Sequence, residues 1–395
     1  MSRPTAITLF SGGGFAALGL QQAGYQVVGA IEYDTAIAAC YAANVGPVEV
    51  QDLSVAPARY FARWAGIDLL QASPPCPNFS RAKTGGYETV LDYRLAGTVC
   101  RAVRVIRPRT FLLENVRGYV HSASYARIVA TVQALGYTIH AAILNSADYG
   151  VPQTRERLIL RAVRTGPVPA LLPTHRKRGD WFSAPWVGWY AAIEDLIDTL
   201  PPAVFAPWQV ARLPDLLAAM GVLVASQNSG QEYGKLHRTG NEPALTVTAV
   251  TRPSPMPRAF LYPPGNGDGT TPLRGAAAPS YTVVDASRQT PRAFLLDGGQ
   301  QPDDPGGCTR RDAGDPAFTL TAGTGTQRPV KAWFDQDQGR VVALTPLALA
   351  RFQSVPPSYV LPDHARTACR IIGNGVPVLL MQRLGEGLRP AGVGL

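Results

Sequence analysis

The chain has 395 residues, of which 46% are hydrophobic and 16% charged, so it can bury a sizeable core and is not a disordered polymer. Its 37 Lys and Arg against 28 Asp and Glu give a net charge of +9, which permits a polyanionic partner. No apolar run reaches the length of about eighteen residues that a membrane-spanning helix needs. Five cysteines without a paired CxxC spacing argue against a disulfide framework or a bound metal, and a cytoplasmic location is expected.

Short apolar runs alternate with helical patterns through the first half of the chain. In chain order, strands are predicted at 6–10, 27–31, 67–70, 110–113 and 158–162, and helices at 15–22, 95–106 and 126–135. This alternation predicts an α/β fold with a doubly wound, mostly parallel sheet. Ligands of such sheets bind at the carboxyl ends of the strands.

The character of the sequence changes near residue 201, where Pro, Gly and Thr become frequent. Similar segments start at Pro243, Pro279 and Pro316, and each precedes a second apolar run. Their β-branched, period-2 pattern predicts a smaller β-rich domain over 201–338 with three approximate repeats. Residues 201–339 carry twelve basic and twelve acidic side chains, so the positive charge resides elsewhere. A helical pattern at 346–352 and an apolar segment starting at residue 371 are expected to rejoin the first core, giving a discontinuous domain of 1–200 and 339–395.

A glycine turn joins the first predicted strand to the first helix. Phe10, Gly12 and Gly14 lie in this turn, and Glu32 ends the next strand, where dinucleotide-type folds bind ribose hydroxyls. A plain tight turn explains the glycines equally well. Asp52 is a further candidate acidic contact, or simply a surface aspartate.

Cys76 lies in the segment Ser-Pro-Pro-Cys-Pro that follows the strand at 67–70. The flanking prolines stiffen this loop and favour an exposed thiol, which becomes a nucleophile when nearby cations lower its pKa. Glu114 follows another strand and is expected at the same edge of the sheet, where a carboxyl group can protonate a ring nitrogen. Arg155 and Arg157 alternate at the start of a strand and share one face. Each of these features alone also fits an ordinary solvated or buried residue.

Taken in order, these segments resemble the cytosine-C5 DNA methyltransferase family. The resemblance rests on the glycine turn, Glu32, Asp52, Pro75-Cys76, Glu114-Asn115-Val116 and Gln153-x-Arg155-x-Arg157, and on two later blocks, 340–353 and Gly373-Asn374-x-Val376-Pro377. In that family the segment before the last two blocks is a variable target-recognition domain, which corresponds here to 201–338.

The resemblance implies a mechanism. A Cys76 thiolate attacks C6 of a cytosine flipped out of duplex DNA, and C5 then takes the methyl group of S-adenosylmethionine. Glu114 would stabilise the protonated N3, Arg157 the O2, and Arg155 a loop or phosphate. The residues implied to bind S-adenosylmethionine, with no metal, are Phe10, Gly12, Gly14, Glu32, Tyr33, Asp52, Pro75, Leu95, Asn374 and Val376.

Three positions depart from the family pattern. Thr8 replaces an aspartate at the end of the first strand, Phe15 replaces a glycine, and Pro77 replaces the glutamine after the cysteine. None of these changes removes a group that the reaction requires. The implied protein is a monomer that acts on double-stranded DNA, either with a cognate restriction endonuclease for the same site or as an orphan methylase.

Three other hypotheses are open. An RNA cytosine methyltransferase would share the scaffold, but the sizeable 201–338 segment disfavours it. A catalytically silent DNA-binding protein is motivated by Thr8 and Phe15, and retention of Cys76, Glu114 and Arg157 argues against it. A redox protein would need a resolving cysteine near Cys76 in the sequence, and none is present there.

Overall fold

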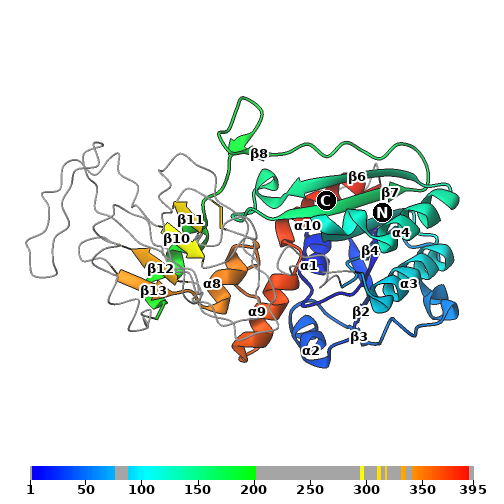
Figure 1. Ribbon diagram of the computed structural model, residues 1–395, viewed down its shortest axis with the longest axis horizontal. Coiled ribbons are helices and arrows are strands. Elements are labelled where there is room, and N and C mark those ends of the chain that lie inside the picture. Colours follow the sequence, from blue (N-terminus) through cyan, green and yellow to red (C-terminus); the bar gives the residue numbers. More distant parts are fainter. Residues whose placement is uncertain are drawn as a thin grey trace, which may run out of the picture.

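The computed structural model describes residues 2–75, 88–201, 294–297, 309–312, 316–317, 331–334 and 340–390 (Figure 1). Cys76 and Pro77 lie outside the described residues, and so does most of the predicted recognition domain.

A seven-stranded sheet forms the centre of the larger part of the molecule (Figure 1). Its strand order is β3-β2-β1-β4-β5-β7-β6. The first five strands of this order pair in parallel, and β7 runs antiparallel to both β5 and β6. The predicted α/β fold with a mostly parallel sheet is therefore confirmed. The strands are β1 (Thr5–Leu9), β2 (Gln26–Glu32), β3 (Glu49–Val50), β4 (Leu69–Ala72), β5 (Thr110–Val116), β6 (Thr138–Asn145) and β7 (Glu156–Val163).

Helices cover both faces of this sheet. Side chains alternate along a strand, so Phe111 and Leu113 of β5 pack into one core and Leu112 packs into the other. The first core also receives α3 (Val90–Ile106) and α4 (Ala123–Ala134). The second core contains residues of α1 (Phe15–Gln22) and α10 (Val378–Leu388). The C-terminal apolar segment therefore packs into the core formed by the first half of the chain.

Two helix starts depend on capping groups. The predicted helix at 95–106 begins earlier, at Val90, because Thr89 and Asp92 form a capping box in which each side chain binds the other's backbone N–H. The helix α2 (Thr35–Asn44) starts at Asp34, whose Oδ1 accepts from the N–H groups of Ala36 at 2.9 Å and Ile37 at 3.1 Å. Asp34 also pairs with Arg370 of α9 (Ala365–Asn374).

The pKa of Asp34 reflects these contacts. Burial alone would raise the pKa, but the hydrogen bond from Ile37 and the Arg370 guanidinium outweigh burial and hold it below its ordinary value. Asp34 is therefore ionised at neutral pH, and its ion pair ties α2 to α9 across more than three hundred residues of sequence.

The remaining short elements connect these layers. They are η1 (Ala58–Trp64), η2 (Arg117–His121), η3 (Ser146–Tyr149), β8 (His175–Arg176), β9 (Ala184–Pro185), α5 (Trp189–Ile193), η4 (Glu194–Thr199) and α8 (Pro346–Arg351).

Four short strands form a separate antiparallel sheet of order β11-β10-β12-β13 (Figure 1). Two of them, β10 (Phe294–Asp297) and β12 (Lys331–Phe334), fall in corresponding runs of the predicted repeats and pair directly, with Phe294 opposite Trp333. The other two are β11 (Thr309–Asp312) and β13 (Arg340–Ala343). Most of 201–338 lies outside the described residues, so the three repeats and the domain boundaries stay predictions.

A short bridge joins this segment to the start of β7. The Ala317 N–H donates to the Pro152 carbonyl oxygen at 2.5 Å, and the Thr154 N–H donates to the Ala317 carbonyl oxygen at 2.6 Å. Among the described residues, no helix is long and apolar enough to cross a membrane. That same part of the chain contains no cluster of three His, Cys, Asp or Glu side chains able to hold a metal ion.

Candidate active site

The glycine turn after β1 adopts a backbone conformation that few residues tolerate. Phe10 has φ 58°, Gly12 φ 55° and Gly14 φ 93°, all in the left-handed region. A Cβ atom on Gly12 would meet nothing within 4 Å, so this glycine is required for its backbone conformation and faces open space. Phe10 is one of three non-glycine residues with positive φ in the described part of the chain, and this conformation is uncommon for a bulky side chain.

The Ser11 side chain links this turn to the neighbouring strand β2 by hydrogen bonds. Its Oγ donates to the Thr8 carbonyl oxygen at 2.9 Å and accepts from the Ile31 N–H at 3.0 Å. The Thr8 hydroxyl lies 2.7 Å from the Ser11 hydroxyl and is fully buried. Thr8 thus contributes a neutral hydrogen bond inside the turn at the position where the family pattern has an aspartate.

Glu32 lies directly beside the turn. Its Oε2 accepts from the Gly12 N–H at 2.8 Å, and its Oε1 accepts from the Asp34 N–H at 2.9 Å. Two backbone donors therefore fix the carboxylate at the end of β2. Tyr33 follows it with a largely exposed ring, and Asp52 beyond β3 accepts from the Ser54 N–H at 2.8 Å.

The other residues predicted to bind the methyl donor are distributed over three elements. Pro75 is exposed after β4, Leu95 is buried on α3, and Val376 is buried in the core that contains α1 and α10. Asn374 is exposed at the end of α9. The structure thus places Phe10, Gly12, Gly14 and Glu32 together at one turn, and the roles of all ten residues in binding the methyl donor remain predictions.

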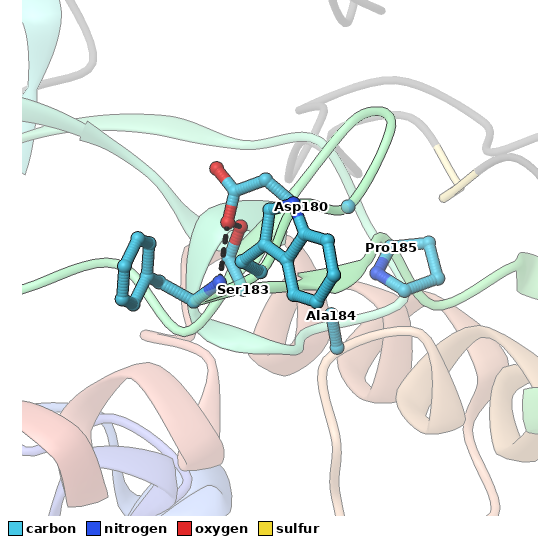
Figure 2. A pocket seen from close by; sticks show the side chains of 7 residues that line it. Asp180, Ser183, Ala184 and Pro185 are labelled. Carbon is cyan, nitrogen blue, oxygen red and sulfur yellow. Dashed lines mark hydrogen bonds between the residues drawn. The ribbon is translucent and has the colours of Figure 1, made fainter.

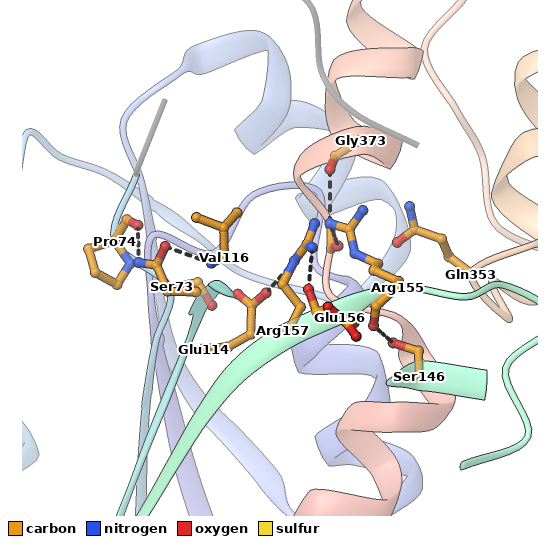
Figure 3. Close-up of polar contacts among 12 residues, drawn as sticks. Ser73, Pro74, Glu114, Val116, Ser146, Arg155, Glu156, Arg157, Gln353 and Gly373 are labelled. Carbon is orange, nitrogen blue, oxygen red and sulfur yellow. Dashed lines mark hydrogen bonds and ion pairs between the residues drawn. The ribbon is translucent and has the colours of Figure 1, made fainter. Parts of the chain in front are cut away.

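Glu114 and Arg157 form a buried ion pair on the neighbouring strands β5 and β7 (Figure 3). The Arg157 Nε lies 3.2 Å from the Glu114 Oε1, and the two side chains are 10% and 6% exposed. Arg157 lies opposite Val116 in the β5–β7 ladder, which brings its side chain to the end of β5. The two groups that were predicted to contact one ring are therefore adjacent and largely shielded from water.

The loop that leads to Cys76 is held against the same strands. The Asn115 Nδ2 donates to the Pro74 carbonyl oxygen at 3.1 Å, and the Ser73 N–H donates to the Leu9 carbonyl oxygen at 3.3 Å. These bonds hold Ser73 and Pro74 against the ends of β1 and β5, and Figure 3 shows the two residues beside Val116. We call the edge formed by the ends of β1, β2, β4 and β5 the carboxyl rim. Cys76, which follows Pro75, is outside the described residues.

Arg155, which was predicted to hold a loop or a phosphate, contacts the turn between α9 and α10. Its side chain is 1% exposed, and its Nη2 donates to the carbonyl oxygens of Gly373 at 2.9 Å and Gly375 at 2.8 Å (Figure 3). Arg155 therefore fixes the turn between α9 and α10, where Asn374 and Val376 lie. Sequence alternation predicted the shared face of the two arginines but gave no information on this long-range partner.

Tyr359 is a further contact of the site that the sequence did not indicate. Its hydroxyl donates to the Gly13 carbonyl oxygen, and its ring packs edge-on against Phe15 with centroids 5.2 Å apart. A Cβ atom on Gly375 would meet the Phe15 ring at 2.3 Å. Phe15, the second departure from the family pattern, thus fills a buried space that Gly375 leaves open, and it helps join the glycine turn to the C-terminal segment.

The chain matches the family model of the C-5 cytosine-specific DNA methylases over residues 5–185 and 275–389. It belongs to this family. The prediction of a DNA (cytosine-5-)-methyltransferase, made from the ordered motifs, is confirmed at the level of the family.

Curated relatives agree with this assignment. The type II methyltransferase M.AgeI of Thalassovita gelatinovora is 27% identical over 454 residues, which cover 98% of this chain and 99% of the relative. The type II methyltransferase M.XorII of Xanthomonas oryzae pv. oryzae is 35% identical over 185 residues, which cover 43% of each chain. The chain thus spans less than half the length of M.XorII and nearly all of M.AgeI.

Solved structures support the fold. A DNA modification methyltransferase encoded within an E. coli prophage aligns with a TM-score of 0.55 and 18% identity, covering 98% of both chains. The Dnmt2 methyltransferase of S. pombe aligns with a TM-score of 0.51 and 16% identity, covering 97% of both chains. At these identities the likeness concerns the fold alone.

Proposed function

We propose that this protein methylates C5 of one cytosine within a short site of double-stranded DNA, using S-adenosylmethionine as the methyl donor and Cys76 as a covalent nucleophile. The observation that carries the proposal is the buried Glu114–Arg157 pair at the carboxyl rim, next to the Ser73–Pro75 segment that leads to Cys76. A carboxyl group and a guanidinium held together offer a complementary donor set for N3 and O2 of cytosine. The rim also contains the glycine turn on which a methyl donor can lie.

Each residue has a defined part in this reaction. The Cys76 sulfur bonds to C6, and Glu114 supplies a proton to N3, so the electron pair of the C5–C6 double bond becomes available at C5. C5 bonds to the methyl carbon as the bond from that carbon to the donor sulfur breaks. A base then removes the C5 proton, elimination returns the Cys76 thiolate, and N3 gives its proton back to Glu114, which leaves a neutral 5-methylcytosine. Arg157 holds O2 throughout.

The residues at the glycine turn fit a nucleoside-bearing donor. Gly12 faces open space, and the Glu32 carboxylate is fixed by two backbone donors while it keeps lone pairs for ribose hydroxyls. S-adenosylmethionine would supply an electrophilic methyl group there. Arg155, through its bonds to Gly373 and Gly375, acts as a positioning residue for the α9–α10 turn.

The target base lies inside a duplex, so it has to leave the base stack before C6 can meet Cys76. We expect a monomer in the cytoplasm that acts alone or beside an endonuclease for the same site. The type II methyltransferase names of its relatives are in keeping with a restriction-modification setting.

Incubation with S-adenosylmethionine carrying a labelled methyl group tests the proposed substrate. We expect label to enter duplex DNA as 5-methylcytosine at one short site and not to enter RNA of the same sequence. Transfer to RNA alone would replace DNA by RNA as the substrate, and duplex binding without any transfer would identify a silent DNA-binding protein. Either result would overturn the proposal.

The segment 201–338 is proposed to select the site. Exchanging it for the corresponding segment of a relative with a different target should change which cytosines are methylated, while the chemistry remains. Bisulfite sequencing of DNA from cells that express each chimaera checks this. An unchanged methylated site would refute the assignment of 201–338 as the recognition domain.

A further inference from the structure

A loop between two short strands that pair in parallel, β8 and β9, exposes two adjacent aromatic rings. Trp181 is 98% and Phe182 is 97% exposed, in the loop between β8 and β9. Large apolar side chains that are almost completely exposed and adjacent are unusual on a folded surface and commonly mark an interaction site. The proposed reaction does not use either ring.

Hydrogen bonds of Asp180 hold this β8–β9 loop in a defined conformation. The Asp180 Oδ1 accepts from the Phe182 N–H at 2.9 Å and from the Ser183 Oγ at 2.7 Å, and the Asp180 N–H donates to the Ser183 carbonyl oxygen at 2.8 Å. Figure 2 shows Asp180 and Ser183 facing each other across the loop, with Ala184 and Pro185 leading away. The bonds involve only Asp180, the backbone and Ser183, so they leave both aromatic side chains directed at solvent. The rings are thus presented on an ordered turn.

The two ends of this loop, at Thr174 and Trp186, both bond to Asp148 of η3. The Thr174 N–H donates to the Asp148 carbonyl oxygen at 2.9 Å, and the Trp186 Nε1 donates to the Asp148 Oδ1 at 2.9 Å. The two strands also pair with each other in parallel, and the Ala184 N–H donates to the Thr174 carbonyl oxygen at 3.0 Å. The β8–β9 loop is therefore anchored to η3.

This anchor lies on the same side of the sheet as the proposed chemistry. η3 follows directly after the end of β6, and both β5 and β6 run antiparallel to β7, so β6 ends at the same edge as β5. In the β7 ladders, Arg157 lies opposite Val116 on one side and Leu144 on the other. The β8–β9 loop is thus anchored at the edge where β5 and β6 end, which contains Glu114 and Arg157, and Figure 1 shows β8 at the top of the molecule.

The positive charge of the β8–β9 loop indicates a polyanionic binding partner. Arg176, Lys177 and Arg178 are consecutive and exposed, and Asp180 is the only acidic residue between 175 and 185. The Arg176 Nε lies 3.3 Å from the Asp180 Oδ2 in an exposed pair, which leaves Lys177 and Arg178 available. Residues 201–339 are neutral overall, so they do not supply the net positive charge that a DNA-binding surface needs.

We propose that residues 174–186 form a DNA-contacting loop that binds the duplex beside the target site, with Lys177 and Arg178 on phosphates and Trp181 and Phe182 against the sugars and bases of a groove. The inference rests on the proposed function, because it takes the occupant to be the substrate duplex. Exposed aromatic side chains next to cations are the combination that nucleic acid-binding surfaces use. The β8–β9 loop would then extend the stretch of DNA that the enzyme contacts beyond the bases that it recognises.

The test measures duplex affinity by fluorescence anisotropy for the full chain, using a long duplex and a short one that retains the methylated site but lacks the flanks. We expect the double variant Trp181→Ala/Phe182→Ala to bind the long duplex at least 10-fold more weakly than the wild type. On the short duplex the two should bind equally. Leu172→Ala, which removes another exposed apolar side chain from the preceding segment, should leave both affinities unchanged.

Salt dependence tests the cations separately. Lys177→Ala/Arg178→Ala should reduce the slope of log Kd against log salt concentration by about 2, because each phosphate contact contributes roughly 0.9. Binding of S-adenosylmethionine and the melting temperature of each variant establish that the fold is intact.

If the wild type and both double variants bound the long duplex with equal affinity, the DNA-contacting role of residues 174–186 would be ruled out. The proposed function would be unaffected. A change confined to self-association in sedimentation experiments would also rule out this role, because the exposed rings would then bind a second copy of the chain. Failure of the wild-type chain to bind any duplex would overturn the proposed function and the inference together.

Discussion

We expect the Cys76→Ser variant to lose methyl transfer to DNA, with a rate lower by on the order of 10⁴-fold or more. A serine hydroxyl is not ionised at neutral pH, and without an activating base it cannot form the bond to C6 on which the later steps depend. Binding of duplex DNA and of S-adenosylmethionine should be retained, because the side chain changes by one atom. Transfer of labelled methyl groups under single-turnover conditions measures the effect.

Cys369→Ser is the matched control for this variant. Burial raises the pKa of the Cys369 thiol on α9 to about 11, so this thiol is protonated at neutral pH and unsuited to act as a nucleophile. The control should methylate DNA at a rate close to that of the wild type. If Cys76→Ser kept a tenth or more of the wild-type rate, covalent catalysis by Cys76 would be ruled out.

The second large effect is expected for Glu114→Gln. An amide keeps the shape of the side chain and can still contact Arg157, but it cannot supply a proton to N3, so kcat should fall roughly 10²- to 10⁴-fold. The variant also leaves the buried Arg157 charge without its counter-ion, which should cost on the order of 3 kcal/mol of folding free energy. Both kcat and the free energy of unfolding are therefore measured, at a temperature well below the lower melting point.

The variant Glu156→Gln is the control for Glu114→Gln. It removes a carboxylate beside Arg157 but leaves the proposed proton donor in place. Glu156 neighbours Arg157 on β7 and pairs with Arg117 at 3.1 Å, but both side chains of this pair are about half exposed. Exposed pairs contribute little, so its loss should change stability by less than about 1 kcal/mol and leave kcat unaltered. If Glu114→Gln and Glu156→Gln lowered kcat equally, the assignment of Glu114 as the proton donor would be wrong.

Sequence patterns predicted the parts of the site that depend on local structure. A strand followed by a glycine turn and a helix places Gly12 next to Glu32, because neighbouring parallel strands end at one edge. The same reasoning placed Glu114 at the carboxyl rim. These predictions succeed because the hydrophobic pattern locates a buried strand to within a few residues, although β5 continues through Glu114 to Val116, past its predicted end at residue 113.

Contacts between distant segments could not be predicted in the same way. Nothing near Arg155 in the sequence indicates that its guanidinium binds the carbonyl oxygens of Gly373 and Gly375. Likewise, the fit of Phe15 against Gly375 and Tyr359 depends on how the C-terminal helices pack on α1. The edge strand β6 was also missed, since half-buried and exposed residues dominate it and its pattern lacks the apolar run of a central strand.

The covalent step can be measured most directly with duplex DNA in which the target cytosine is replaced by 5-fluorocytosine. After attack at C6 and methyl transfer, fluorine cannot leave C5 as a proton does, so elimination stops and the enzyme stays bonded to DNA. The account predicts a stable complex that requires S-adenosylmethionine, with the DNA attached at Cys76 by peptide mass spectrometry. An enzyme that methylates ordinary duplex DNA but forms no such complex, or forms one at another residue, would contradict it.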